Sequence, residues 1–297
     1  MRRPLNRLSL LSLTLAGLTL TAPIDALGQP EASGRIVLVT GSTSGLGKEV
    51  ARELARSGDH VIIHGRSVER GEALVAEITA AGGSARFYRA DFASLAQVRA
   101  LAESILGDYD RLDVLVNNAG VWLDDEDGRL LSEDGHELAF QVNYLAGYLL
   151  TDMLLPLLKE SAPARIINVA SAAQRPIDFD DVMMEEGYSS GRGYAQSKLA
   201  QVIQAFVLAE ELEGTGVTVN ALHPATMMDT PMVLSRGARA RTSVDEGTEA
   251  VLQLVNAPEL GSGRYFNGME PARANMQAYE PEARARLMDL SRALTGS

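Results

Sequence analysis

Apolar and polar residues follow two alternating patterns along most of the chain. From Arg35 onward, short runs rich in Val, Ile and Leu give way to longer stretches in which apolar residues recur at helical spacing. The short runs predict seven strands, at residues 35–40, 60–65, 85–91, 112–120, 164–171, 217–224 and 263–268. The longer stretches predict helices near residues 45–57, 68–81, 94–107, 133–158, 192–213 and 245–256.

This order of elements predicts the class of fold. Strands that alternate with helices are typical of βαβ units, which build parallel sheets. The strand runs are apolar at consecutive positions rather than at every second one, which implies that the sheet is buried on both faces. We therefore predict an α/β fold with a doubly wound parallel seven-stranded sheet, a Rossmann-type three-layer sandwich, in a single domain at residues 29–297.

The first 28 residues have a different pattern. A basic stretch, MRRPLNR, is followed by the apolar run LSLLSLTLAGLTLTA, and ALG before Gln29 fits a small-x-small cleavage site. We predict that residues 1–28 are an export signal, which would place the mature protein in the periplasm or outside the cell. Two alternatives stay open. The leader could remain as an anchor, with residues 8–22 in contact with a membrane, or the translation start could be wrongly set, which would leave the protein in the cytoplasm.

Composition and charge exclude several classes of function. The chain has 297 residues and a formal net charge of −12, which disfavours a sequence-independent grip on nucleic acid, because such a grip neutralises phosphates with Lys and Arg. The absence of cysteine removes disulfides, thiolate nucleophiles and Cys-based zinc sites, and the four histidines are scattered. We therefore expect no metal centre and no nucleic-acid partner.

A glycine-rich turn joins the first predicted strand to the first predicted helix. The sequence TGSTSGLG carries Gly41, Gly45 and Gly47, and a helix start offers free N–H groups to a negative charge. A glycine cluster alone is weak support, but its place between a buried strand and a helix fits a pyrophosphate cradle. The predicted cradle consists of Gly41, Ser42, Thr43, Ser44, Gly45, Leu46 and Gly47.

With this Gly-x3-Gly-x-Gly spacing, the chain resembles the short-chain dehydrogenase/reductase family. The resemblance extends from residue 35 to about residue 270 and rests on motifs in the family's order. They are TGSTSGLG, DF at 91–92, NNAG at 117–120, Asn143 in FQVNYLAGYLLT, Ser171 in INVAS, YAQSK at 194–198 and HPATMMDT at 223–230. Within the family, HGRSVERGE and FQVNYLAGYLLT look most similar to the retinol-dehydrogenase-type reductases.

The residues after the second predicted strand indicate which nicotinamide cofactor is used. An acidic residue at this point binds the ribose 2′-hydroxyl of NAD and repels a 2′-phosphate. Here the sequence is HGRS, without a carboxylate, and Arg66 can pair with the 2′-phosphate, helped by Ser67 and by Ser42 or Thr43. We therefore predict NADP(H) rather than NAD(H). The alternative is that Arg66 is a solvated residue at a helix start.

The resemblance assigns further cofactor contacts. It implies that Asp91 and Phe92 lie at the adenine, and that Asn117, Ala119 and Gly120 lie beside the cofactor, where glycine permits close backbone approach. It also implies that Pro224 and Thr226 belong to a turn next to the nicotinamide and that His223 is structural. The family's usual Pro-Gly is here Pro224-Ala225, which puts the local backbone in question. Trp122 could line the nicotinamide end of the pocket or cap the core.

YAQSK places Tyr194 and Lys198 one helical turn apart, so their side chains emerge from the same face. The pKa of a phenol is about 10, and a nearby ammonium lowers it by favouring the phenolate. Hydride transfer between a carbonyl and an alcohol needs a group that delivers or removes a proton at the same oxygen. We predict that Tyr194 is this acid/base.

Two further residues complete the predicted catalytic set. Ser171 ends the fifth predicted strand, at the carboxyl edge where open α/β sheets bind ligands, and its hydroxyl can hydrogen-bond the substrate oxygen. The resemblance implies that Asn143 supports a water relay to Lys198. It also implies that Lys198, with Tyr194, holds the nicotinamide ribose.

The substrate pocket is expected to be formed by residues 121–130, 172–193 and 226–245, which include five methionines. Because methionine provides flexible apolar surface, we expect an apolar aldehyde, ketone or alcohol as substrate. The acidic run at 124–129 is expected to be a solvated loop. Apolar faces wider than one stripe on the helices around Asn143 and after Tyr194 indicate a second contact surface. The resemblance implies that these helices build a dimer, so we expect a homodimer or homotetramer. The alternative function is a non-catalytic NADP(H)-binding regulatory or interaction protein of the same fold.

Overall fold

A computed structural model of the protein describes Met1 and residues 34–258 and 260–296, so that the rest of the predicted leader at residues 1–28 lies outside the described residues. In that part of the chain one sheet runs in the order β3-β2-β1-β4-β5-β6-β7-β8. The strands are β1 (Ile36–Val39), β2 (His60–Gly65), β3 (Ser84–Arg89), β4 (Val114–Asn117), β5 (Ala164–Val169), β6 (Val217–His223), β7 (Arg264–Asn267) and β8 (Glu270–Ala272).

The predicted fold class is confirmed. All neighbouring pairs from β3 to β7 are parallel, and the chain reverses its winding direction between β1 and β4, as a doubly wound sheet requires. The sheet has one strand more than predicted, because β8 pairs antiparallel with β7 at the edge. β8 is three residues long and contains a proline, so it lacks the apolar run by which the other strands are recognised.

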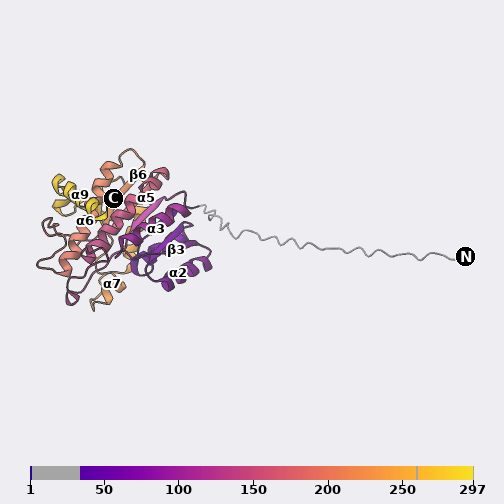
Figure 1. Cartoon of the computed structure of the whole chain (residues 1–297), viewed down its shortest axis with the longest axis horizontal. Coiled ribbons are helices and arrows are strands. Elements are labelled where there is room, and N and C mark those ends of the chain that lie inside the picture. The colour runs from indigo at the N-terminus through magenta and orange to yellow at the C-terminus, as the bar shows by residue number, and fades with distance from the viewer. Residues whose placement is uncertain (2–33, 259, 297) are drawn as a thin grey trace.

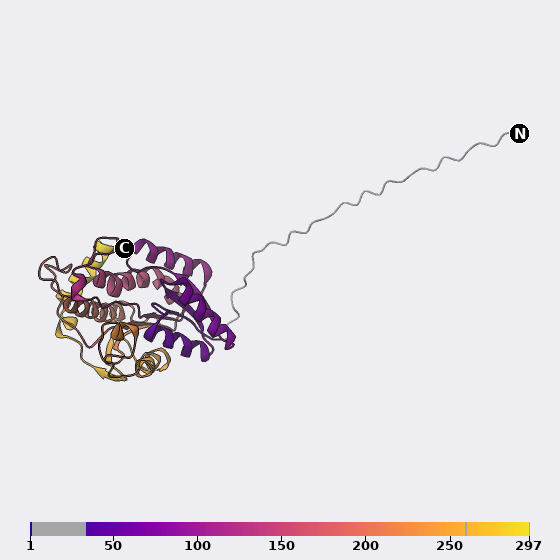
Figure 2. The same ribbon diagram turned by 90° about the horizontal axis from the view of Figure 1, so that it is seen from below.

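Helices cover both faces of the sheet (Figure 2). One layer contains α1 (Gly45–Arg56), α2 (Val68–Ala80) and α8 (Val244–Asn256), and the other contains α3 (Leu95–Asp108), α5 (Ala146–Glu160) and α6 (Ser190–Glu211). Consecutive residues of β1 show why the strands are apolar throughout. Ile36 and Leu38 belong to the core on the α3, α5 and α6 side, whereas Val37 and Val39 belong to the core on the α1 and α8 side.

The predicted helix at 133–158 is divided into several elements. Regular structure begins with α4 (Leu138–Phe140), passes through one turn of π-helix, η2 (Gln141–Leu145), and continues as α5. Gly135, with a φ of 82°, lies in the turn that precedes α4, and the Glu137 carboxylate accepts hydrogen bonds from the first N–H groups of the helix. Three other short helices are η1 (Asp125–Asp127), α7 (Pro231–Leu234) and η3 (Met276–Tyr279).

A C-terminal helix, α9 (Pro281–Thr295), was not predicted and packs on α6 (Figure 1). The Phe206 and Tyr279 rings lie 5.4 Å apart, and Arg284 forms an ion pair with Glu210 at 2.6 Å. Leu208 and Leu212, which widened the apolar face of α6, are buried within the chain. The apolar width of this helix is therefore accounted for without a second copy of the protein.

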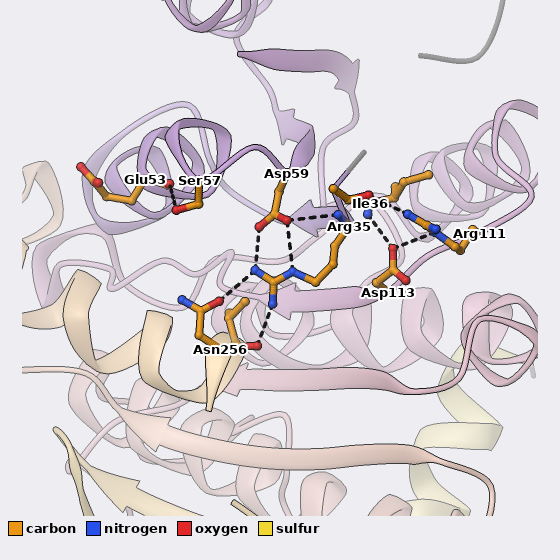
Figure 3. A network of polar contacts seen from close by, with 10 residues as sticks. Arg35, Ile36, Glu53, Ser57, Asp59, Arg111, Asp113 and Asn256 are labelled. Atoms are coloured by element: carbon orange, nitrogen blue, oxygen red, sulfur yellow. Dashed lines mark hydrogen bonds and ion pairs between the residues drawn. The ribbon is translucent and has the colours of Figure 1, made fainter. Parts of the chain in front are cut away.

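A polar network closes the end of the sheet that lies opposite the strands' carboxyl ends (Figure 3). Arg35, just before β1, pairs with Asp59 at 2.7 Å and donates to Val255 O and Asn256 Oδ1 at the end of α8. Asp113 accepts from the Ile36 N–H at 2.6 Å. These contacts fix the starts of β1 and β2 against α8 and leave the other end of the sheet to form the cleft described below.

Candidate active site

A cleft of about 1010 Å³ opens at the carboxyl ends of the central strands. This is where open α/β sheets bind ligands, and the volume is at the upper limit for a small-molecule site. The predicted site residues that line it are Gly41, Thr43, Ser44, Gly45, Leu46, Gly47, Arg66, Asp91, Phe92, Ala119, Gly120, Ser171, Tyr194, Lys198, Pro224 and Thr226. Four predicted residues are not part of the lining, namely Ser42, Ser67, Asn117 and Asn143.

The glycine turn at the start of α1 packs closely against the segment after β4. Gly41 has a φ of 65°, and a Cβ there would lie 2.8 Å from the Ala119 Cα. A Cβ on Gly47 would lie 2.4 Å from Asn118 Nδ2. No side chain caps the α1 N-terminus at Ser44, and the first turn carries no acidic residue. The first N–H groups of this helix are thus free to bind an anion such as a pyrophosphate.

Ser42 and Ser67 have structural roles that the sequence analysis missed. The Ser42 hydroxyl is fully buried, donates to Val39 O at 2.7 Å and accepts from the His64 N–H at 3.0 Å, so it points away from the cleft. Ser67 caps α2 by accepting from the Arg70 N–H. The Ser42 hydroxyl is therefore engaged away from Arg66, whereas Ser67, next to Arg66 in the sequence, keeps an O–H that no hydrogen bond among the described residues uses, and its predicted help to Arg66 stays a prediction.

His64 holds the glycine turn in place through a hydrogen bond and ring stacking. Its Nδ1 accepts from the Gly41 N–H at 3.2 Å, and its Nε2 lies 3.2 Å from Ala90 O, which fits the tautomer protonated at Nε2. Its ring stacks on Phe92 with centroids 4.3 Å apart. Burial lowers the pKa of His64 to about 4, so the imidazole is neutral at physiological pH.

Two arginines lie at the far end of the cleft, where β2 and β3 end. Arg66 is exposed, with its Nη1 3.7 Å from Asp91 Oδ2. Arg70, on the first turn of α2, also lines the cleft and has no side-chain partner among the described residues. The sequence analysis named Arg66 but not Arg70, although the spacing of four residues along one helix start could have indicated both.

The NNAG motif divides its two asparagines between two environments. Asn117 is buried and donates to Thr151 Oγ1 and to Asn168 Oδ1, each at 2.9 Å, so its side chain faces the core. Asn118 lines the cleft instead and donates to Thr40 O at 2.8 Å. The prediction that Asn117 lies beside the cofactor therefore stays a prediction for its backbone at the end of β4, while its side chain packs in the core. Successive residues at the end of a strand point to opposite faces, and the motif alone does not say which one faces the ligand.

Asn143 does not line the cleft but hydrogen-bonds two segments that do. It lies in the π-helical turn η2, a type of turn that often occurs at functional sites. Its Oδ1 accepts from the Val121 N–H at 2.7 Å, and its Nδ2 donates to Val121 O at 3.0 Å and to Ser197 Oγ at 2.9 Å. Asn143 therefore joins the segment after β4 to the turn of α6 that carries Tyr194.

Lys198 is buried against the end of β5. Its Nζ donates to Val169 O and to Gln201 Oε1, each at 2.9 Å, and lies 5.6 Å from the Tyr194 ring centroid. A Cβ on Gly120 would lie 3.4 Å from this amine, so a glycine at position 120 leaves space for the Lys198 amine. Burial lowers the pKa of Lys198 to about 7.

The Tyr194 phenol lies beside Ser171. Burial raises the pKa of Tyr194, and a hydrogen bond with the Ser171 side chain opposes this rise only in part. The net pKa of Tyr194 is therefore raised rather than lowered as predicted, since burial is its largest cause and Lys198 is not among the groups that shift it. Ser171 Oγ accepts from the Ala173 N–H at 3.1 Å, which leaves its own proton available.

The remaining candidates lie at the open side of the cleft. His223 Nε2 and Thr226 Oγ1 are 3.0 Å apart, and burial lowers the pKa of His223, in agreement with a structural role. Met227 adopts a φ of 54°, so the backbone strain of this turn is on that residue. Trp122 lines the cleft, which decides between its two predicted places.

The acidic run at 124–129 is partly engaged with its neighbours. Asp124 pairs with Arg236 at 2.7 Å, and Asp125 Oδ1 accepts from the Ser190 N–H at 2.7 Å. Among the residues that the structure describes, no three His, Asp or Glu side chains come together as metal ligands would. In the same residues no helix combines the length and the apolar character needed to cross a membrane.

Comparison with known proteins identifies the family. The family described as short chain dehydrogenase matches residues 35–240, so the chain belongs to this family of oxidoreductases and the predicted resemblance is confirmed. Human (Homo sapiens) retinol dehydrogenase 14 is 35% identical over 295 residues, which cover 89% of this chain and 87% of that protein. Human retinol dehydrogenase 13 is 37% identical over 287 residues, covering 89% and 85%.

Solved structures agree with this assignment. An uncharacterized protein from Mycobacterium paratuberculosis superposes with a TM-score of 0.74 at 29% identity, covering 89% of this chain and 94% of the other. RhlG from Pseudomonas aeruginosa, solved as an active-site complex with NADP, gives a TM-score of 0.64 at 29% identity, covering 79% and 94%. A 3-ketoacyl-(acyl-carrier-protein) reductase from Brucella melitensis, solved with NADH, gives 0.65 at 27% identity, covering 79% and 96%.

Proposed function

We propose that the protein is an NADP(H)-dependent oxidoreductase that interconverts an apolar aldehyde or ketone and its alcohol, with Tyr194 as the acid/base. The observation that carries the proposal is the meeting of Ser171, Tyr194 and Lys198 in one cleft that also contains the open N-terminus of α1. A ligand bound along this cleft would have its anionic part at the glycine turn and its reactive end at Tyr194.

The residues present fit a nicotinamide dinucleotide. The free N–H groups of α1, in the part of the cleft that Gly41, Gly45 and Gly47 line, would hold the pyrophosphate. Arg66 and Arg70 would hold a 2′-phosphate, since no carboxylate follows β2 directly. The NADP complex of RhlG supports the choice of cofactor, whereas the NADH complex of the Brucella reductase shows that the fold accepts either one.

The chain's own residues would handle the proton. When bound, the nicotinamide supplies the hydride that the substrate's carbonyl carbon accepts. The Tyr194 O–H donates its proton to the carbonyl oxygen as that oxygen gains negative charge, and the free proton of Ser171 hydrogen-bonds the same oxygen. Lys198 lies one helical turn behind, where its amine can hold ribose hydroxyls and share in returning a proton to Tyr194.

The pKa shift of Tyr194 sets the protonation state of the resting site. Because burial raises the pKa of Tyr194, the phenol stays protonated at neutral pH and is ready to donate its proton in carbonyl reduction. Alcohol oxidation starts from the phenolate instead, so we propose that its rate rises with pH.

An apolar substrate is supported by the lining at the Tyr194 end. Trp122 lies against Tyr194, and Val121, Met232 and Val233 also line the cleft. The relatives named retinol dehydrogenase point to the same kind of compound, a long apolar alcohol or aldehyde. We propose substrates of this class, with all-trans-retinal and decanal as the compounds to try first.

Assembly and location are separate proposals. Burial accounts for the α6 face, but Met153 and Leu155 of α5 are only partly buried, and we propose a homodimer or homotetramer, which light scattering would test. Location outside the cytoplasm rests on residues 1–28 alone. Intact-mass spectrometry of the protein from its own cells would show whether that leader is removed.

The direct test of function is NADPH consumption in the presence of all-trans-retinal or decanal. Tyr194→Phe should lower kcat by roughly 10²-fold or more while NADPH still binds. Tyr188→Phe is the matched control, since the Tyr188 hydroxyl is buried, has no hydrogen-bond partner among the described residues and does not line the cleft. NADPH binding without turnover of any carbonyl would favour the alternative, a non-catalytic NADP(H)-binding protein.

A further inference from the structure

We infer that Arg236 is a positioning residue, which holds Trp122 against Tyr194 and so determines how bulky a carbonyl compound the cleft accepts. The part that concerns substrates rests on the proposed function, whereas the contact itself can be tested without any substrate. The inference starts from the way in which two separate walls of the cleft meet.

Arg236 makes four contacts with the segment after β4. Its Nη1 donates to Trp122 O at 3.2 Å and to Leu123 O, and pairs with Asp124 Oδ1 at 2.7 Å. Its guanidinium carbon lies 4.3 Å from the Trp122 ring centroid, within the range of a cation–π contact. The Arg236 side chain is only 17% exposed, whereas its ion-pair partner Asp124 is 54% exposed, so the contacts with Trp122 and Leu123 are the ones shielded from solvent. One planar guanidinium thus holds both the backbone and the ring of the same segment.

Trp122 in turn contacts the proposed acid/base. The Trp122 and Tyr194 ring centroids lie 5.6 Å apart at an interplanar angle of 34°. The indole Nε1 is buried and has no hydrogen-bond partner in the part of the chain that the structure describes. No side-chain hydrogen bond therefore orients this indole. Its position therefore depends on packing against its neighbours, which include the cationic Arg236 and the aromatic Tyr194.

The cleft has two walls that meet at Arg236, namely the segment that carries α7 and the segment after β4 that contains Trp122. Each wall is also held in place by contacts of its own. The segment that carries α7 is closed at its base, where the Arg241 N–H donates to Met227 O at 2.9 Å and the Thr242 hydroxyl donates to Thr226 O at 2.9 Å. The opposite wall is fixed to the start of α6, where Asp125 accepts from the Ser190 N–H. Between these anchors, the contacts of Arg236 connect the tip of one wall with the other.

This arrangement has a consequence for substrate choice. The cleft is lined by Trp122, Tyr194, Met232 and Val233, so the contact between Arg236 and Trp122 lies directly beside the proposed reaction site. A narrow substrate can reach Tyr194 while this contact stays intact. A bulky substrate must displace the indole and therefore breaks the contacts of Arg236.

Trp122 is the single tryptophan of the chain, so its fluorescence reports on this contact alone. The experiment compares the full-length wild-type protein with Arg236→Gln, Arg236→Lys and Arg239→Gln. Arg239 lies on the same segment, is exposed and has no side-chain partner among the described residues, which makes Arg239→Gln the matched control for loss of one charge. We expect acrylamide to quench Trp122 more strongly in Arg236→Gln than in the wild type, and Arg239→Gln to behave as the wild type. Arg236→Lys keeps the ion pair with Asp124 but lacks the planar fork, so its quenching should be intermediate.

The kinetic comparison uses hexanal and the bulkier adamantanecarbaldehyde with NADPH. In Arg236→Gln, the ratio of kcat/KM for the bulky over the narrow aldehyde should rise roughly tenfold, equivalent to about 1.4 kcal/mol. A general loss of stability would lower both values together and leave the ratio unchanged.

Two results would overturn the inference. One is unchanged Trp122 quenching in a folded Arg236→Gln protein, and the other is an equal change in Arg239→Gln. Should Arg236→Gln fail to fold, Arg236→Lys carries the same comparison. If the wild type turns over no aldehyde, the proposed function fails, while the quenching result still decides whether Arg236 holds Trp122.

Discussion

Lys198 should make the stability of the cofactor-free protein depend on pH in a specific way. The residue is 3% exposed, and burial lowers its pKa from 10.5 to about 7. Between these two values the unfolded chain binds a proton that the folded protein does not. Stability therefore rises with pH across this interval, by up to about 1.4 kcal/mol per pH unit.

From pH 7 to pH 9 the gain from this one group is roughly 2 kcal/mol, because the folded amine is still half protonated at the start of the interval. The perturbation is Lys198→Met, which keeps the length of the side chain but cannot ionise. Loss of the hydrogen bonds to Val169 O and Gln201 Oε1 lowers the free energy of unfolding of the variant by an amount that does not change with pH. The variant should therefore lack the slope that the wild type shows.

The assay is urea unfolding of both proteins, without nucleotide, at three pH values between 7 and 9. Lys159→Met, an exposed lysine on α5, is the matched control and should keep the wild-type slope. Parallel slopes in the wild type and Lys198→Met would refute the reasoning, since they would mean that the folded amine is protonated as readily as an exposed one.

Three further results are expected. Gly41→Ala should destabilise the protein by about 1–3 kcal/mol in urea unfolding, because φ is 65° and the new Cβ would lie 2.8 Å from the Ala119 Cα, while Gly107→Ala, in open space on α3, should not. Because burial raises the pKa of Tyr194, carbonyl reduction should keep its rate up to about pH 9, and alcohol oxidation should gain up to about tenfold per pH unit in steady-state assays. Deletion of residues 281–297 should uncover Phe206, over whose ring Arg284 lies, and the Tyr144 hydroxyl, which contacts Ser291 Oγ, and should lower the midpoint of urea unfolding relative to the full chain.

Much of the fold was predictable because the strands are buried on both faces. Continuous runs such as those of β1, β2 and β5 differ from any helical pattern, and the glycine turn marks the passage from β1 to α1. β8 and the π-helical turn could not be predicted. β8 has no apolar run, and a π-helical turn retains the apolar spacing of the helices on either side.

The candidate site was predictable in its membership but less so in its details. Motif order brought Ser171, Tyr194 and Lys198 together, yet it did not say that Asn118 rather than Asn117 would face the cleft. Spacing also predicted the wrong sign for the pKa of Tyr194. One helical turn fixes the distance between two charges, but burial is set by the whole fold and had the larger effect. Arg236 and Trp122 are 114 residues apart, and no local pattern indicates their contact.

Calorimetric titration of the full chain with NADPH and with NADH tests the central claim most directly, because the proposed reaction depends on the cofactor. NADPH should bind at least about tenfold more tightly than NADH, and Arg66→Ala should remove most of that difference, since charged hydrogen bonds to the 2′-phosphate are lost. Arg292→Ala, on the exposed side of α9, should leave both affinities unchanged. Equal binding of NADPH and NADH by the wild type, or no binding of either by the folded protein, would contradict the account.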